Sequence, residues 1–203
     1  MLQFKTARLF SFAASALLLS STTTIRIEAK VITESTTVSN NVSTDQLVNV
    51  ARWHYGSTLV LPINNEFQRI TTSEIQNFEE AVFLSSNTVI SYKINQGKHR
   101  YIIDFGAITP ISRFFINNHT ASGTLALAHC DTLEAIDSDH WNPLALPLNF
   151  GNGVIPSITF NETHTRYLLI KLEIQKEGAI GNFGATGSLS QKQASAFNQI
   201  FQD

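Results

Sequence analysis

The stretch from Arg100 to Gly187 most constrains the fold, because it is a succession of short apolar strands with little helical pattern. Its clearest strand runs from Tyr167 to Gln175, where apolar and polar side chains alternate. One face carries Leu168, Ile170, Leu172 and Ile174, and the other carries Lys171, Glu173 and Gln175. This period of two predicts a strand with one face in the core and the other in solvent.

Further strands are predicted at 101–105, 111–116, 124–129 and 158–160, and Pro110 is expected to separate the first two. Turn signals recur every ten residues or so. This spacing predicts an all-β fold, an antiparallel β-sandwich with short peripheral helices.

The segment before Arg100 is more mixed. Residues 47–52 and 57–62 predict short strands around a turn at Tyr55-Gly56, and 88–93 predicts a strand that neighbours 101–105 through a turn at 95–98. Between them, Ser73 and Gln76 fit a capping box, and apolar residues follow at helical spacing. The sequence therefore predicts a short helix or a structured loop over 73–83.

The two ends of the chain differ in character from its middle. Residues 1–29 begin with Lys5 and Arg8 and continue into an apolar run, which is typical of a secretory signal peptide. That run is shorter than the roughly 20 residues of a spanning helix, so an uncleaved membrane anchor is the less favoured alternative. A flexible leader (30–46), a sandwich domain (47–187) and a helical tail (188–203) are expected to follow. The protein is therefore expected to be secreted, extracellular or periplasmic.

Composition argues against several kinds of partner and against an internal disulfide. The formal net charge is −2 and 15% of residues are charged, which argues against nucleic acid and against anionic membranes as partners. Cys130 is the only cysteine, so no internal disulfide can form, and it is expected to be a buried, small apolar residue. Glycosylation sequons start at Asn41, Asn118 and Asn161.

Five segments together resemble the discoidin, or coagulation-factor type C, family. These are Tyr101-Ile102-Ile103-Asp104-Phe105-Gly106, Gly123-Thr124-Leu125-Ala126-Leu127-Ala128, His140-Trp141, Arg166-Tyr167-Leu168-Leu169-Ile170 and Asn182-Phe183-Gly184. The resemblance covers roughly the last half of the chain and implies the galactose-binding-like jelly-roll fold. It marks fold positions and not ligand contacts, and the disulfide common in animal members is missing here.

Two polar-aromatic clusters could bind a sugar, because an aromatic ring can stack on a sugar ring while polar groups hydrogen-bond its hydroxyls. The first contains Arg52, Trp53 and His54, followed by Tyr55, and the second contains Asp139, His140 and Trp141. The alternative for Trp141 is a packing role beneath a loop, which the family resemblance favours. For Trp53 and His54 the two interpretations are balanced.

Metal and catalytic sites receive weaker support. Asp131, Asp137 and Asp139, with Glu134, offer oxygen ligands that would suit Ca²⁺ in a structural role, although a solvated acidic loop is the favoured interpretation. The histidines lack zinc spacing and no Gly-x-Ser-x-Gly turn occurs, so no catalytic residue is predicted. His129 is expected to be a hydrogen-bonded core histidine, and Asp104 to bind backbone amides in the turn before Gly106.

The sequence thus favours a secreted, non-enzymatic module that binds carbohydrate or a glycosylated surface through loops at one end of the sandwich. A structural or adhesive domain that binds another protein is the alternative. A hydrolase would need a carboxylate pair in a cleft, and no such pair is recognisable.

Overall fold

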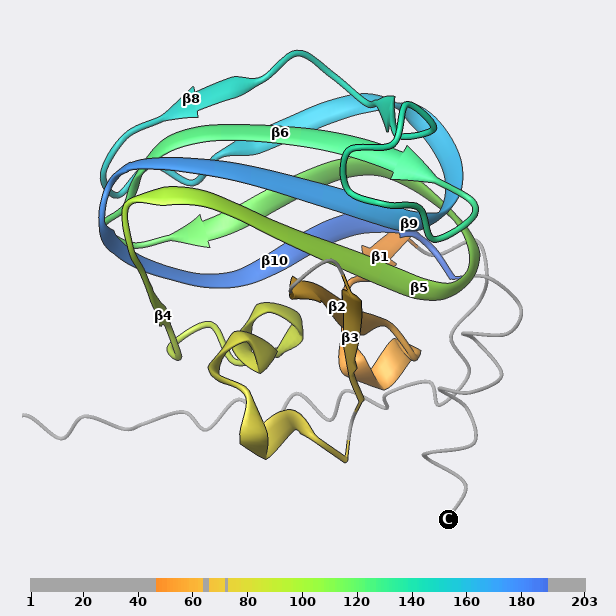
Figure 1. The fold of residues 1–203 in the computed structure, drawn as a ribbon, viewed down its shortest axis with the longest axis horizontal. Helices are drawn as coiled ribbons and strands as arrows, with labels where there is room; N and C mark the ends of the chain where they lie inside the picture. Colours follow the sequence, from red (N-terminus) through yellow and green to blue (C-terminus); the bar gives the residue numbers. More distant parts are fainter. Residues whose placement is uncertain (1–46, 64–65, 72, 190–203) are drawn as a thin grey trace, which may run out of the picture. The chain divides into compact units, whose positions relative to one another are not determined.

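A computed structural model describes residues 47–63, 66–71 and 73–189, which belong to one compact unit (Figure 1). The expected signal peptide and leader lie outside the described residues. So does the expected helical tail, except for Ser188, which ends the last strand, and Leu189. None of the helices in the described ranges could span a membrane.

The described part contains ten strands and three short 3₁₀ helices. In chain order they are β1 (Leu47–Asn49), η1 (Trp53–Tyr55), β2 (Thr58–Ile63), β3 (Glu66–Ile70), η2 (Ile75–Asn77), η3 (Glu79–Leu84), β4 (Tyr92–Ile94), β5 (Gly97–Asn118), β6 (Ser122–Cys130), β7 (Asn142–Pro143), β8 (Leu148–Phe150), β9 (Ser157–Lys176) and β10 (Gly178–Ser188).

The predicted antiparallel β-sandwich is confirmed, and the long strands β5 and β9 link its layers (Figure 1). The first half of β5 pairs with β2 and with the second half of β9, which in turn pairs with β6. The second half of β5 pairs with β10 and with the first half of β9. The main core lies between these layers and contains the fully buried Phe105, Phe114 and Phe183.

The expectation that Pro110 separates two strands is wrong, because Pro110 lies inside β5 opposite His164. The β5–β9 register shifts between Asp104 and Thr109, so both strands turn a corner there without ending. Gly106 has φ 77, a left-handed conformation that favours glycine and allows this corner. The strands predicted at 158–160 and 167–175 are likewise one strand, β9.

One stretch of the first layer is buried on both faces. Val60, Ile102, Tyr167 and Leu169 point away from the main core and form a second cluster with Trp141. The connection between β6 and β7 contributes Leu133 and Ile136 to this cluster. The predicted alternation in β9 therefore holds for its exposed Glu173 and fails at Leu169, since a loop covers that end of the strand.

Before β5, the prediction for 88–93 is wrong, and the prediction for 73–83 is wrong only in its cap. Residues 88–93 contribute only to β4, which pairs with β10 and not with β5, while Val89 and Ile90 are 85% and 50% exposed. The short helix or structured loop predicted over 73–83 is confirmed, because the segment forms η2 and η3 with an extended residue, Phe78, between them. The capping box is wrong, since neither helix has a side-chain cap. Instead of a capping box, the Glu74 carboxylate accepts hydrogen bonds from the backbone and hydroxyl of Thr71.

The described sequons differ in access. Asn118 is 4% exposed and its amide nitrogen donates to the carbonyl oxygens of Ala121, Gly151 and Val154, whereas Asn161 is exposed on β9. If the protein is exported from a host that N-glycosylates, mass spectrometry of the secreted protein is expected to find a glycan on Asn161 and none on Asn118. A glycan on Asn118 in folded protein would contradict this arrangement.

Candidate functional site

The helix η3 is anchored to the sandwich by Phe83, which is fully buried. Its ring stacks on Phe183 of β10 with centroids 4.3 Å apart, and its edge contacts Tyr101 at 4.8 Å and Tyr92 at 5.2 Å. Aromatic pairs of this kind add stabilisation beyond the burial of area. The anchored ring fixes η3 against β10, β4 and β5.

Three side-chain hydrogen bonds hold the backbone and side chains around η3 in place. Trp53 of η1 donates its indole N–H to the Ala81 carbonyl at 3.1 Å, and Asn182 of β10 donates to the Ser85 carbonyl at 2.9 Å. Tyr92 of β4 donates its hydroxyl to Oε1 of Glu80 at 3.2 Å. Because these donors come from three separate elements, η3 is a defined platform.

A groove of about 390 Å³ opens beside this platform, and we call it the Trp53 groove. Trp53 and Phe78 give it aromatic walls, and Glu79 and Ser85 give it polar groups. Its remaining lining residues are Ile75, Ala81, Val82 and Ile90. Trp53 is half-buried and its N–H is already bonded, so the orientation of its ring in the groove is set before a ligand arrives.

The geometry of η3 also separates its two acidic residues. Successive residues of a 3₁₀ helix are about 120° apart, so adjacent side chains point in different directions. Glu79 lines the Trp53 groove, whereas Glu80 lines a second cleft on the side of Tyr92 and β5. Ile75, Phe78 and Val82 lie at helical spacing in the sequence, and all three line the groove.

The neighbours of Trp53 in the first predicted cluster have different surroundings. Arg52 is 8% exposed, and its guanidinium donates to the carbonyl oxygens of Ala51 and Phe183. Burial lowers the pKa of Arg52 to about 10, so it still carries its charge at neutral pH. His54 is half-buried with its ring 4.2 Å from that of Tyr55, and burial, followed by the Arg52 charge, lowers its pKa. Arg52 thus binds the backbone of β10, and Trp53 is the residue of this cluster that lines the groove.

The second predicted cluster lies in the connection 131–141. Trp141 is 5% exposed and donates its indole N–H to the Ala135 carbonyl at 2.8 Å, which matches the packing role favoured for it. Asp139 and His140 are exposed, and Nδ1 of His140 lies 3.4 Å from Oε1 of Glu134. The two tryptophans belong to different clusters, so they do not form a shared platform.

Asp131, Asp137 and Asp139, the residues considered for calcium, are all exposed in that connection. Across the described parts of the chain, no three His, Cys, Asp or Glu side chains gather in an arrangement that could hold a metal ion. The pKa of the neighbouring Glu134 is lowered by hydrogen bonds from Thr132 and His140, contacts within the loop itself. Calcium binding by this loop remains a prediction.

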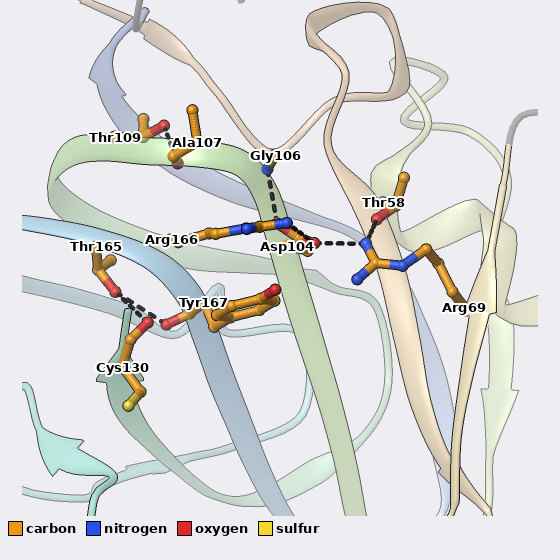
Figure 2. A network of polar contacts seen from close by, with 10 residues as sticks. All are labelled: Thr58, Arg69, Asp104, Gly106, Ala107, Thr109, Cys130, Thr165, Arg166 and Tyr167. Carbon is orange, nitrogen blue, oxygen red and sulfur yellow. Dashed lines mark hydrogen bonds and ion pairs between the residues drawn. The ribbon is translucent and has the colours of Figure 1, made fainter. Parts of the chain in front are cut away.

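Asp104 forms a charged network at the β5 corner (Figure 2). Its side chain is 1% exposed and accepts from Nη1 of Arg69 at 2.5 Å, Nε of Arg166 at 3.1 Å and the backbone N–H of Gly106 at 2.7 Å. The contact with Gly106 confirms the predicted structural role of Asp104. The two arginines were not foreseen, because they lie on β3 and β9, far from Asp104 in sequence.

Two other predictions concern residues at the end of β6. His129 shares a face with Leu125 and Leu127 as predicted, but it is only half-buried. Its buried Nδ1 has no hydrogen-bond partner within the described ranges. The prediction that His129 is a hydrogen-bonded core residue is therefore wrong. Burial lowers the pKa of His129, opposed by the Asp131 charge. Cys130 is half-buried beside the second cluster and is a free thiol.

Comparison with known proteins yields structural similarity only. Neither a scan of protein-family models nor a search of curated proteins found a match. Among solved structures, the module CpGH89CBM32-6 produced by Clostridium perfringens is 12% identical, with a TM-score of 0.50, over 70% of this chain and 100% of that chain. A mutant of chitosan-binding module 1 from a chitosanase/glucanase of Paenibacillus sp. IK-5 is 14% identical, also with a TM-score of 0.50, over 70% and 100%. The chain therefore has the β-sandwich fold of carbohydrate-binding modules.

Proposed function

We propose that this chain is a secreted, non-catalytic, discoidin-like module that binds carbohydrate or a glycosylated surface in the Trp53 groove. The observation that carries the proposal is the groove itself, whose lining combines two aromatic residues with one glutamate and one serine. An apolar wall with a few fixed polar groups is the usual composition of a small-ligand site. The fold, shared with carbohydrate-binding modules, supports the same function.

The chemistry of the groove suits a sugar ring. The C–H face of a pyranose can lie on the Trp53 ring, while its hydroxyls donate to Glu79 and exchange hydrogen bonds with Ser85. Because η3 is anchored by Phe83 and by the bond from Trp53, little conformational entropy is lost on binding. Asp139 and His140 remain proposed as a second ligand-contacting surface, since both are exposed.

The Trp53→Ala variant is expected to lose binding on a glycan array at least tenfold, which corresponds to about 1.4 kcal/mol. The wild-type protein should be screened with and without calcium. Trp141→Phe is the matched control, because Trp141 is buried in a different cluster and should leave binding unchanged. In the Trp141→Phe background Trp53 is the sole tryptophan, so its emission should shift when a binding sugar is added.

Other outcomes assign the site elsewhere. Binding that survives Trp53→Ala but disappears in the Asp139→Ala, His140→Ala double variant would place the ligand on the connection 131–141 and contradict the groove. Calcium dependence would implicate Asp131, Asp137 and Asp139. Each comparison requires that the variants unfold at the wild-type temperature.

A protein-interaction or adhesive function is the second candidate, favoured by the apolar rim of the same groove. Ile90 is 50% exposed at this rim and Val89 is 85% exposed beside it in sequence. Exposed apolar groups that cluster beside a groove often mark contact surfaces. A folded, monodisperse protein that stays silent on the array would favour this second function.

A further inference from the structure

A groove of about 200 Å³ lies on the outer face of the first layer, and we call it the Lys171 groove. On this face, the row of side chains that contains Leu169 is covered, because it belongs to the second cluster. The next row along the strands consists of Arg100 on β5, Lys171 on β9 and Ala126 on β6, and all three line the groove. None of its lining residues lines the Trp53 groove. The other lining residues are Thr124, Pro147, Leu172 and Glu173.

Arg100 and Lys171 form a pair of like charges. They are directly opposite each other in the β5–β9 register, where Cβ atoms on one face are about 5 Å apart. Both are half-buried, and neither forms an ion pair in the part of the chain that the structure describes. The following row places Lys98 opposite Glu173, so these two rows hold three cations and one anion. Like charges placed opposite each other destabilise a sheet, and an anion bound between Arg100 and Lys171 would offset this repulsion.

The Arg100 guanidinium is directed across β9. Its Nη1 donates to the carbonyl oxygens of His99 at 2.9 Å and of Leu172 at 3.5 Å. Leu172 lies between Lys171 and Glu173, so the guanidinium reaches β9 between these two side chains. Among the described residues, no acceptor binds Nε or Nη2 of Arg100. These two N–H groups form a planar fork that matches the two oxygens of a carboxylate.

The acceptors of the groove define which anion fits it. Glu173 is exposed and lies opposite Thr124 on β6. The Thr124 hydroxyl donates to Oδ1 of Asn149 at 2.7 Å, and its oxygen can still accept a hydrogen bond. A matching ligand therefore has one negative charge and several hydroxyl donors, whereas Glu173 would repel a densely charged anion. The groove is also smaller than the roughly 300 Å³ at which sites for drug-sized ligands begin, which limits it to a small group.

We infer that the Lys171 groove binds one uronate residue of an acidic polysaccharide. The carboxylate of the sugar pairs with Nε and Nη2 of Arg100 and with the Lys171 ammonium. The sugar hydroxyls donate to Glu173 and Thr124. Charge-assisted hydrogen bonds are stronger than neutral ones, which gives the groove its preference for a charged sugar. This site goes beyond the function proposed for the Trp53 groove and does not depend on it.

Calorimetric titration of the protein with trigalacturonic acid tests the inference, with its methyl ester and sodium acetate as comparison ligands. We expect saturable binding of the acid and at least tenfold weaker binding of the ester, which lacks the charge. Acetate, which lacks the hydroxyls, should show no saturable binding.

Three variants locate the acid on the protein. Lys171→Met, which removes the charge and keeps most of the stem, should weaken acid binding about tenfold, and Lys171→Arg should retain binding. Ala126→Leu changes no charge but fills space in the groove, and it should also weaken acid binding about tenfold. Lys176→Met, at an exposed cation outside the groove, is the matched control and should bind as wild type.

The result is separable from that of the Trp53 groove. Trp53→Ala should bind trigalacturonic acid with unchanged affinity, whether or not the Trp53 groove binds a neutral glycan. Equal affinity for acid and ester, no binding of the acid, or loss of acid binding in Trp53→Ala would each overturn the inference. Wild-type affinity in Lys171→Met or in Ala126→Leu would overturn it as well. Unchanged unfolding temperatures establish that a variant's lost affinity arises in the Lys171 groove.

Discussion

Replacing Asn118 by aspartate is expected to lower the free energy of unfolding by about 4 kcal/mol at pH 7, because a carboxylate would then be buried without a positive partner. The Asn118 amide nitrogen lies 3.0 Å from the carbonyl oxygens of Ala121 and Gly151 and 2.9 Å from that of Val154. In the variant, a carboxylate oxygen would face these three acceptors. The other oxygen could still accept from the Ala121 N–H, as it does now at 3.1 Å.

Urea unfolding gives the free energy of unfolding of Asn118→Asp and of the control Asn161→Asp. Asn161 is exposed, and both variants carry the same chemical change. The control is expected to stay within about 0.5 kcal/mol of wild type. Burial raises the pKa of the new carboxyl above its unfolded value of about 4, so below that value the carboxyl is neutral in both the folded and the unfolded state. The deficit relative to Asn161→Asp should therefore shrink as the pH falls towards that value and grow as it rises. Equal stabilities at pH 7 would contradict the role of Asn118 as a link between the turn after β5 and the turn before β9.

Replacing Asp104 by asparagine is expected to cost about 3 kcal/mol of unfolding free energy, because hydrogen bonds to charged groups are worth roughly 1.5–3 kcal/mol each. The asparagine oxygen can still accept from Gly106, but its amide N–H₂ would face the Arg69 or Arg166 guanidinium, which is also a donor (Figure 2). The arginine side chains are 38% and 40% exposed, so water can solvate them once the carboxylate is gone. This relief keeps the expected cost below that of Asn118→Asp.

The pH dependence of Asp104→Asn provides a second test. Burial by itself would raise the pKa of Asp104, but hydrogen bonds from Arg166, Gly106 and Arg69 outweigh it and hold that pKa below its usual value. A lowered folded pKa contributes stability that is present above the unfolded value of about 4 and lost as the pH falls through the folded value. The difference between wild type and Asp104→Asn should therefore be constant from pH 7 to 5 and diminish below pH 4. A constant difference down to pH 2 would contradict the network.

Much of the sandwich was predictable because its strands carry a local pattern. The alternation from Leu168 to Ile174 depends on residues two apart, and neighbouring side chains suffice to specify it. The contact between Asp104 and the Gly106 amide is likewise two residues long, and it was correctly anticipated. Pro110 misled the prediction because a proline does not end a strand at a corner where the ladder is already interrupted.

The candidate site was predictable only in part. Trp53 and Trp141 both lie beside polar residues in the sequence, yet one lines a groove and the other fills a cluster under a loop. Nothing within a few residues of either tryptophan distinguishes these outcomes. The groove partners of Trp53 come from 75–90, and they reach it because Phe83 packs on Phe183 about a hundred residues later.

The strand pattern, the all-β class and the residue types able to bind a sugar follow from local sequence, because periodicity and turn chemistry act over a few neighbouring residues. Three features arise only when the chain folds: which of those residues meet a groove, the burial of Asn118 as a link and not an open glycosylation site, and the sharing of Asp104 by Arg69 and Arg166. These contacts join residues tens of positions apart. Their formation depends on which strands pair and which faces are buried, and that choice minimises the free energy of the whole domain and not of any one segment.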